Sequence, residues 1–165
     1  MTATIRPERV GDRSAIQGVV AAAFDGHPHS DGSEPGIVDA LRADGDLAIS
    51  LVAEEGGAIV GHVAFSPVSV SDGSEGWFGL GPVAVDPARQ GEGIGTALIE
   101  RGLDLLRDRG AAGCVVLGDP AYYARFGFAH DPALTYPGPP PEYFQRLVIG
   151  NSGAQGVVAY AGAFG

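Results

Sequence analysis

The chain has 165 residues and a formal net charge of −10 at neutral pH, from 20 acidic and 10 basic residues. This length fits one domain over residues 1–165, long enough to bury about 70% of the surface of its unfolded chain. The acidic balance argues against nucleic acid or an anionic membrane as a partner, because both need clustered Lys and Arg. No apolar run reaches the roughly 20 residues of a membrane span, and residues 1–6 lack the layout of a signal peptide, so we expect a cytoplasmic protein.

The N-terminal half predicts one short strand, two helices and then three strands. A strand over 4–7 is followed by a helix that Asp12 caps and that ends at Phe24, with its apolar residues on one face. A second helix over 34–43 follows the polar loop 26–33. Three apolar segments separated by glycine-rich turns then predict an antiparallel meander of strands over 47–53, 58–70 and 76–85.

The C-terminal half predicts a long helix packed on the sheet and further strands. Helix 94–109 carries one broad apolar face. Strand 113–117 follows this helical crossover, so we expect it to run parallel to strand 76–85, with its single cysteine, Cys114, as an inert buried thiol. The remaining segments are expected as a short helix over 119–125, a strand beginning at 128–130, and a strand over 157–161 that closes the sheet.

The glycine-rich turn between strand 76–85 and helix 94–109 is the most informative segment. Residues 90–96 read Gln-Gly-Glu-Gly-Ile-Gly-Thr, with glycine at three of seven positions. The first N–H groups of a helix have no partner within the helix, and glycine lets an anion reach the main chain. The turn therefore predicts a phosphate or pyrophosphate site.

Two common phosphate-binding motifs do not match this turn. A P-loop is excluded, because Gly95 is followed by Thr96 and Ala97 with no lysine. A Rossmann fingerprint would need Gly or Ala at position 96 or 98, where the chain has Thr96 and Leu98. A glycine-rich turn that binds no ligand is the alternative that these residues leave open.

Two motifs and several longer segments resemble one enzyme family. The spacing Gln90-x-x-Gly93-x-Gly95, between an apolar strand and an amphipathic helix, resembles the acetyl-CoA-binding signature of the GNAT superfamily of N-acetyltransferases. Residues 122–128, Tyr-Tyr-Ala-Arg-Phe-Gly-Phe, resemble its tyrosine-x-x-x-Gly-Phe segment, with Tyr123 at the tyrosine position. Similarity to a bacterial subgroup of predicted GNAT acetyltransferases extends over nearly the whole chain, in residues 61–68, 117–123 and 141–164.

The resemblance implies an α/β (α+β) fold of GNAT type. Its central sheet would be mixed, mostly antiparallel, flanked by helices, and splayed between its fourth and fifth strands. Acetyl-CoA would be the co-substrate, with its pantetheine arm in the splay and its pyrophosphate on the glycine turn. The residues implied for acetyl-CoA binding are Val83, Ala84, Val85, Gln90, Gly91, Gly93, Ile94, Gly95 and Thr96.

The resemblance also implies the chemistry, with Tyr123 as the general acid that protonates the departing thiolate. The alternative for Tyr123 is an aromatic packing residue, as expected of Tyr122 and Phe126 beside it. Strand 76–85 has no carboxylate to serve as general base. The candidates for that role are Glu34, His62, Glu75 or a water molecule.

The function that follows is transfer of acetyl from acetyl-CoA to a primary amine by direct attack. The acceptor, a small molecule or a peptide or protein amine, is left open by the sequence. The oligomeric state is also open, a homodimer included. The alternative function is a non-catalytic acyl-CoA sensor or interaction module. No metal site is expected, since His27 and His29 in the polar loop are too far from each other's plausible partners.

Overall fold

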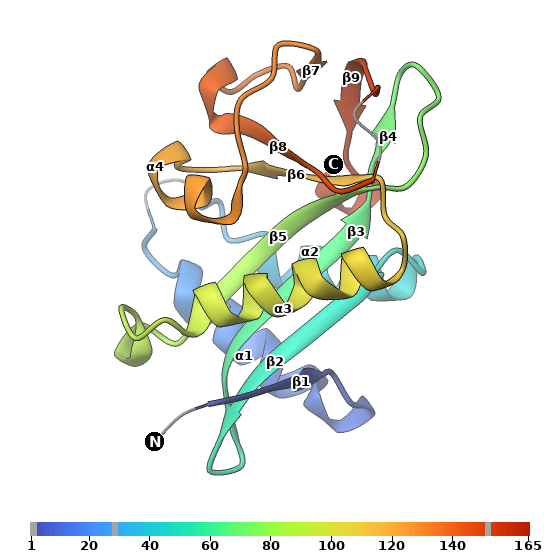
Figure 1. The fold of residues 1–165 in the computed structure, drawn as a ribbon. Coiled ribbons are helices and arrows are strands. Elements are labelled where there is room, and N and C mark those ends of the chain that lie inside the picture. Colours follow the sequence, from blue (N-terminus) through green and yellow to red (C-terminus); the bar gives the residue numbers. More distant parts are fainter. Residues whose placement is uncertain (1–2, 28–29, 151–152) are drawn as a thin grey trace.

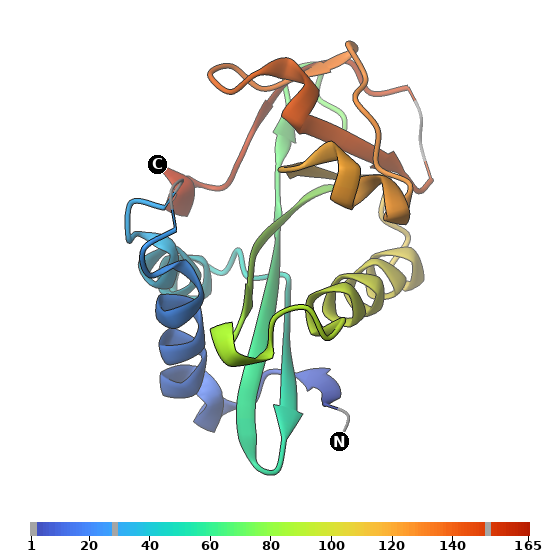
Figure 2. The same cartoon turned by 90° about the vertical axis from the view of Figure 1, so that its left-hand side faces the viewer.

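The computed structural model describes residues 3–27, 30–150 and 153–165. The strands are β1 (Thr4–Pro7), β2 (Ile49–Glu55), β3 (Ala58–Pro67), β4 (Ser69–Val70), β5 (Trp77–Val85), β6 (Gly113–Leu117), β7 (Leu134–Thr135), β8 (Phe144–Val148) and β9 (Gly156–Ala159). The α-helices are α1 (Arg13–Phe24), α2 (Glu34–Ala43), α3 (Ile94–Asp108) and α4 (Pro120–Tyr123). Helices α1 and α2 cover one face of the central sheet and α3 covers the other (Figures 1 and 2).

The central sheet has six strands in the order β1-β2-β3-β5-β6-β8. All neighbouring pairs are antiparallel except β5 and β6, which are parallel, as the helical crossover predicted. Strand β5 pairs with β6 only from Trp77 to Gly79, after which the two strands diverge. The mixed, mostly antiparallel sheet and its splay are therefore confirmed, with the predicted fourth and fifth strands now labelled β5 and β6.

A β-bulge in β5 lies just after the residues that pair with β6. The register of β3 and β5 moves from Val63 opposite Val83 to Phe65 opposite Leu80, so that Gly81 and Pro82 face a single residue of β3. A bulge bends the strand that carries it and increases its twist. It therefore directs the second half of β5 away from β6 and opens the space between them.

Helix α3 packs closely on the sheet because it carries glycine at the contact. A Cβ on Gly102 would lie 2.1 Å from Cε1 of Phe65 on β3. Side chains from both elements form the main core, including Leu98, Ile99 and Leu103 of α3. The predicted apolar face of this helix is confirmed, and it fixes the position of the glycine turn that precedes the helix.

Two predicted strands were wrong in place or pairing. The segment expected to close the central sheet forms β9, which pairs with β4 and β7 in a separate three-stranded sheet. The edge of the central sheet is β8, which the sequence did not reveal, because both Phe144 and Gln145 at its start are buried and break the alternation. At 128–130 there is only an isolated bridge between Ala129 and Arg146.

A helix cap and the bounds of two predicted strands also differ from expectation, and the first of these strands, predicted over 47–53, is β2 at Ile49–Glu55. Asp12 precedes α1 as predicted, but its side chain does not cap the helix. It accepts hydrogen bonds from the Arg6 guanidinium and from the N–H of Arg9 instead. The predicted strand 58–70 is interrupted after Pro67, and its last two residues form β4 in the smaller sheet.

Candidate functional site

Two adjoining cavities lie at the splay of the central sheet. The smaller, of about 460 Å³, is formed by the glycine turn and by Tyr122 and Arg125. The larger, of about 1040 Å³, lies between the diverging ends of β5 and β6, the end of α1, the start of α4 and the proline-rich loop after β7. Tyr122 lines both cavities, so the cavity at the glycine turn and the cavity at the splay meet at its side chain.

The N-terminus of α3 opens into the smaller cavity without a side-chain cap. Gly93 is the N-cap residue, and its φ of 86° is left-handed. The first intrahelical bond runs from the N–H of Ala97 to the carbonyl of Gly93, at 3.0 Å. The N–H groups of Ile94, Gly95 and Thr96 therefore have no partner within the helix, and the helix dipole favours an anion in front of them.

Glycine is favoured at the positions of the turn for two different physical reasons. Gly91 and Gly93 have φ of 82° and 86°, a backbone conformation that other residues adopt only with strain. Gly95 has an ordinary helical backbone, and an added Cβ would meet the Val85 side chain at 3.5 Å and the Tyr122 hydroxyl at 3.9 Å. A side chain at position 95 can thus be accommodated by the fold, but it would occupy the cavity.

The free edge of β5 exposes main-chain groups to the splay. The N–H of Asp86 donates to Val60 of β3 at 2.9 Å, and N–H groups alternate between the two sides of a strand. Val83 and Val85 therefore direct their main-chain groups toward the splay, where the Gln90 side-chain amide reaches the Val85 carbonyl at 3.3 Å. Ala84 faces β3, and its side chain packs against α1, so of the three predicted strand residues it is the one turned away.

Two arginines, Arg89 and Arg125, line the smaller cavity; Arg89 is ion-paired with Glu55 and Glu92, so the positive charge there comes mainly from Arg125. The Arg125 guanidinium lies 4.3 Å from the centre of the Tyr122 ring and donates to the Tyr122 carbonyl at 2.9 Å. Tyr122, expected in the core, is half-buried and bonds through its hydroxyl to Thr96 Oγ1 at 3.0 Å. The sequence did not predict Arg125 or Tyr122 as site residues, although Arg125 stands at helical spacing from Tyr122.

Tyr123 lines the larger cavity from α4. Its ring packs against Gly118, where a Cβ would lie 2.5 Å from Cε2, and edge-on against Tyr122 at 5.0 Å between ring centres. Burial raises the pKa of Tyr123 to about 12. The phenol therefore stays neutral across the physiological pH range and is a hydrogen-bond donor on the wall of the splay.

The site thus combines an uncapped helix, a free strand edge and a tyrosine. Residues 17–128 of the chain match the model of the acetyltransferase (GNAT) family. The chain belongs to the GNAT family. It is 41% identical over 139 residues to the uncharacterized N-acetyltransferase YhbS of Escherichia coli K12, covering 81% of this chain and 80% of that protein.

Solved GNAT structures resemble the whole chain. A GNAT acetyltransferase from Brucella melitensis in complex with acetyl-CoA is 51% identical, with a TM-score of 0.89 over 99% of this chain and 98% of the other. YhbS from Escherichia coli in complex with CoA is 37% identical, with a TM-score of 0.90 over 99% and 92% of the two chains. The GNAT fold expected from the sequence is thus shown by close relatives.

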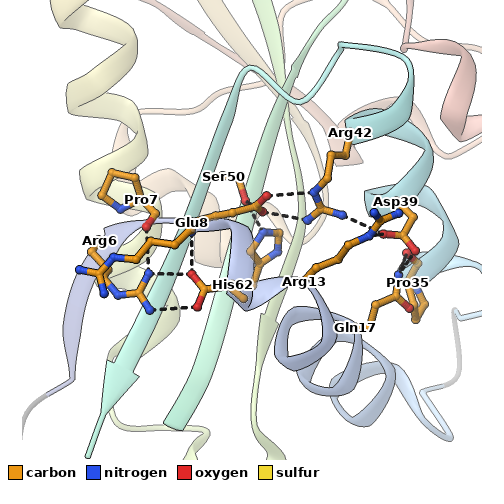
Figure 3. A network of polar contacts seen from close by, with 12 residues as sticks. Arg6, Pro7, Glu8, Arg13, Gln17, Pro35, Asp39, Arg42, Ser50 and His62 are labelled. Atoms are coloured by element: carbon orange, nitrogen blue, oxygen red, sulfur yellow. Dashed lines mark hydrogen bonds and ion pairs between the residues drawn. The ribbon is translucent and has the colours of Figure 1, made fainter. Parts of the chain in front are cut away.

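His62, one candidate general base of this GNAT protein, lies outside both cavities. It is fully buried on β3, and its Nε2 is 2.8 Å from Ser50 Oγ, which donates to Glu8 at 2.6 Å. Glu8 is held in turn by Arg42 of α2, as Figure 3 shows. Burial lowers the pKa of His62 to about 4. Because His62 is buried and lines neither cavity, its ring does not contact an acceptor bound there.

The other two candidate carboxylates also lie apart from the splay. Glu34 accepts a hydrogen bond from Ser30 Oγ at 2.6 Å, and Glu75 is exposed in the loop before β5; neither lines a cavity. The ionisable side chains that do line the larger cavity are His27, Asp119, Tyr122, Tyr123 and Tyr143.

No metal or membrane feature accompanies the site. No group of three potential metal ligands occurs in the described residues. His29 lies outside those residues, so the expectation about His27 and His29 as a pair stays a prediction. Within the same ranges, no helix has the length and apolar character to cross a membrane.

Proposed function

We propose that this GNAT protein transfers acetyl from acetyl-CoA to a primary amine by direct attack. The observation that carries this proposal is the uncapped N-terminus of α3 beside the splay, with two arginines, in a chain of net charge −10. A local anion site in an acidic protein needs such main-chain and guanidinium groups to offset the overall negative field. The complexes of the two solved relatives with acetyl-CoA and CoA support the same ligand.

Each part of acetyl-CoA would have its own set of groups. The pyrophosphate fits the N–H groups from Gly93 to Thr96, reached past Gly91 and Gln90, with Arg89 and Arg125 beside them. The pantetheine arm carries amides, which suit the main-chain groups that Val83 and Val85 direct toward the splay. In this arrangement the thioester would lie toward the larger cavity, on the side of Tyr123.

The attacking nitrogen forms a bond to the thioester carbon, and the carbon–sulfur bond breaks to release a thiolate. Tyr123 would be the general acid for this thiolate. Because an ordinary thiol has a pKa of about 8.5, below that of Tyr123, the phenol stabilises the sulfur by donating a hydrogen bond, and a proton that passes to the sulfur would be returned to the phenolate by water. The proton of the amine would leave to water in the larger cavity, where His27 and Asp119 are the ionisable groups other than tyrosines.

Thermal melting followed by a thiol-release assay tests the proposal. A ligand at a hundredfold excess over its Kd stabilises the folded state by about 2.7 kcal/mol, so acetyl-CoA should raise the melting temperature by several degrees and NAD should not. Equal shifts with both ligands would contradict the acetyl-CoA site. A shift with acetyl-CoA but no thiol release with any amine would favour the alternative, a non-catalytic acyl-CoA sensor.

A further inference from the structure

We infer that the acceptor is a small primary amine on an apolar body, an arylalkylamine or a branched alkylamine, bound in the larger cavity. This inference rests on the proposed function and names its substrate class. The two cavities differ in charge. Arg89 and Arg125 line the smaller one, whereas no Lys or Arg among the described residues lines the larger one. The larger cavity therefore has no permanently charged cation to pair with an anionic acceptor.

Apolar side chains form the walls of the larger cavity beyond the strand ends. Phe24 at the end of α1 and Tyr143 before β8 both line it. Tyr143 is 44% exposed and Leu117, at the end of β6, is 41% exposed; they are two of the four exposed large hydrophobic residues in the described part of the chain. Exposed apolar side chains gathered around one cavity indicate a surface that an apolar ligand covers.

The same walls are poor partners for a peptide main chain. Pro82, Pro139 and Pro140 line the cavity and have no N–H to donate. A bound peptide would have to pair its own main-chain groups, because a buried peptide group without a hydrogen bond is costly. A hydrocarbon or aromatic body has no such requirement. The walls therefore favour a small molecule over a protein N-terminus.

A single carboxylate, that of Asp119, gives the cavity its charge. Asp119 begins α4, and its Oδ1 accepts a hydrogen bond from the N–H of Ala121 at 2.9 Å, which fixes the side chain beside Tyr123 and Gly118 in the cavity wall. A carboxylate attracts an ammonium group as it enters and repels a second carboxylate. An amine without an acid group of its own is thus preferred over an amino acid.

A panel of amines tests this acceptor class directly. Acetylation of phenethylamine, phenylalanine, spermidine and an unblocked alanine tripeptide is followed by thiol release, with methylamine as a small reference. We expect kcat/KM for phenethylamine to exceed that for the other three by at least about tenfold, the range that pocket contacts provide. Asp119→Asn keeps a helix-capping residue and should reduce the preference for phenethylamine over phenylalanine by about tenfold.

Tyr143→Ala tests the apolar wall. We expect KM for phenethylamine to rise by about tenfold, while KM for methylamine and the Kd of acetyl-CoA stay unchanged. Val157→Ala is the matched control, because Val157 is 46% exposed on β9 and lines neither cavity. Unchanged melting temperatures of both variants verify that they fold.

The outcomes separate failure of the acceptor class from failure of the proposed function. A preference for spermidine or for the tripeptide, or a Tyr143→Ala protein that acetylates phenethylamine like the wild type, would overturn the acceptor class and leave the acetyltransferase function intact. A wild-type protein that binds acetyl-CoA but acetylates no amine of the panel would contradict the proposed function, and the acceptor class with it.

Discussion

The buried network around His62 makes a quantitative prediction about stability and pH. His62 has no exposed surface, and its Nδ1 has no hydrogen-bond partner among the described residues. Glu8 and Arg42 are the charged groups that face it through Ser50 (Figure 3). Burial lowers the pKa of His62 to about 4, whereas an unfolded chain holds histidine near about 6.5. Between these values the unfolded chain binds more protons than the folded one.

The sign and size of the effect follow from this difference. The free energy of unfolding has its full value above pH ~6.5, where His62 is neutral in both states. As the pH falls toward 4, only the unfolded chain gains a proton, and the free energy of unfolding decreases by about 1.4 kcal/mol per pH unit. The total loss is about 3 kcal/mol, a large share of the 5–15 kcal/mol that is typical of a folded domain. His62→Gln provides the comparison, because its side-chain amide can still donate to Ser50 but does not titrate.

Urea denaturation of both proteins from pH 7.5 to 4.5 measures this effect. The wild type should lose about 2–3 kcal/mol more than His62→Gln over that interval. Burial alone would raise the pKa of Glu8, but hydrogen bonds from Arg42 and Ser50 hold it below its ordinary value, and Glu8 is present in both proteins. Identical pH dependence would refute the reasoning. A His62→Gln protein that cannot acetylate while it binds acetyl-CoA normally would restore His62 as a candidate catalytic base.

Three further substitutions test the site and its support. Tyr123→Phe should lower kcat by about 10²- to 10⁴-fold with acetyl-CoA affinity nearly unchanged. Tyr136→Phe is the control and should keep full activity, because Tyr136 lines neither cavity. An undiminished rate in Tyr123→Phe would make Tyr123 a packing residue. Gly95→Glu should abolish the melting shift with acetyl-CoA, whereas Gly18→Glu, which adds the same charge on α1, should keep it. Gly102→Ala should lower the free energy of unfolding by about 1–3 kcal/mol in urea denaturation, through overpacking; an unchanged value would mean that α3 can shift freely.

Local patterns in the sequence were sufficient to predict the elements whose structure depends mainly on neighbouring residues. The apolar faces of α1 and α3 and the glycine turn are encoded within short segments, because helical periodicity, left-handed glycines and an uncapped helix start depend on neighbouring residues. The parallel pairing of β5 and β6 followed from the helix between them. The resemblance of residues 90–96 and 122–128 to a GNAT protein added the co-substrate, which the acidic composition alone would not suggest.

Contacts between distant segments decided what the sequence left open. Strand β8 lies at the edge of the central sheet and β9 in another sheet, and no local pattern fixes which partner a short apolar segment finds. The same holds for His62, whose side of the sheet depends on the pairing of β3, and for Tyr122, which lines both cavities and bonds to Thr96 from 26 residues away. The charge contrast between the cavities arises in this way too. The walls of the larger cavity come from α1, β5, α4 and the proline-rich loop. These segments are far apart in the chain, and only tertiary packing brings their side chains into contact.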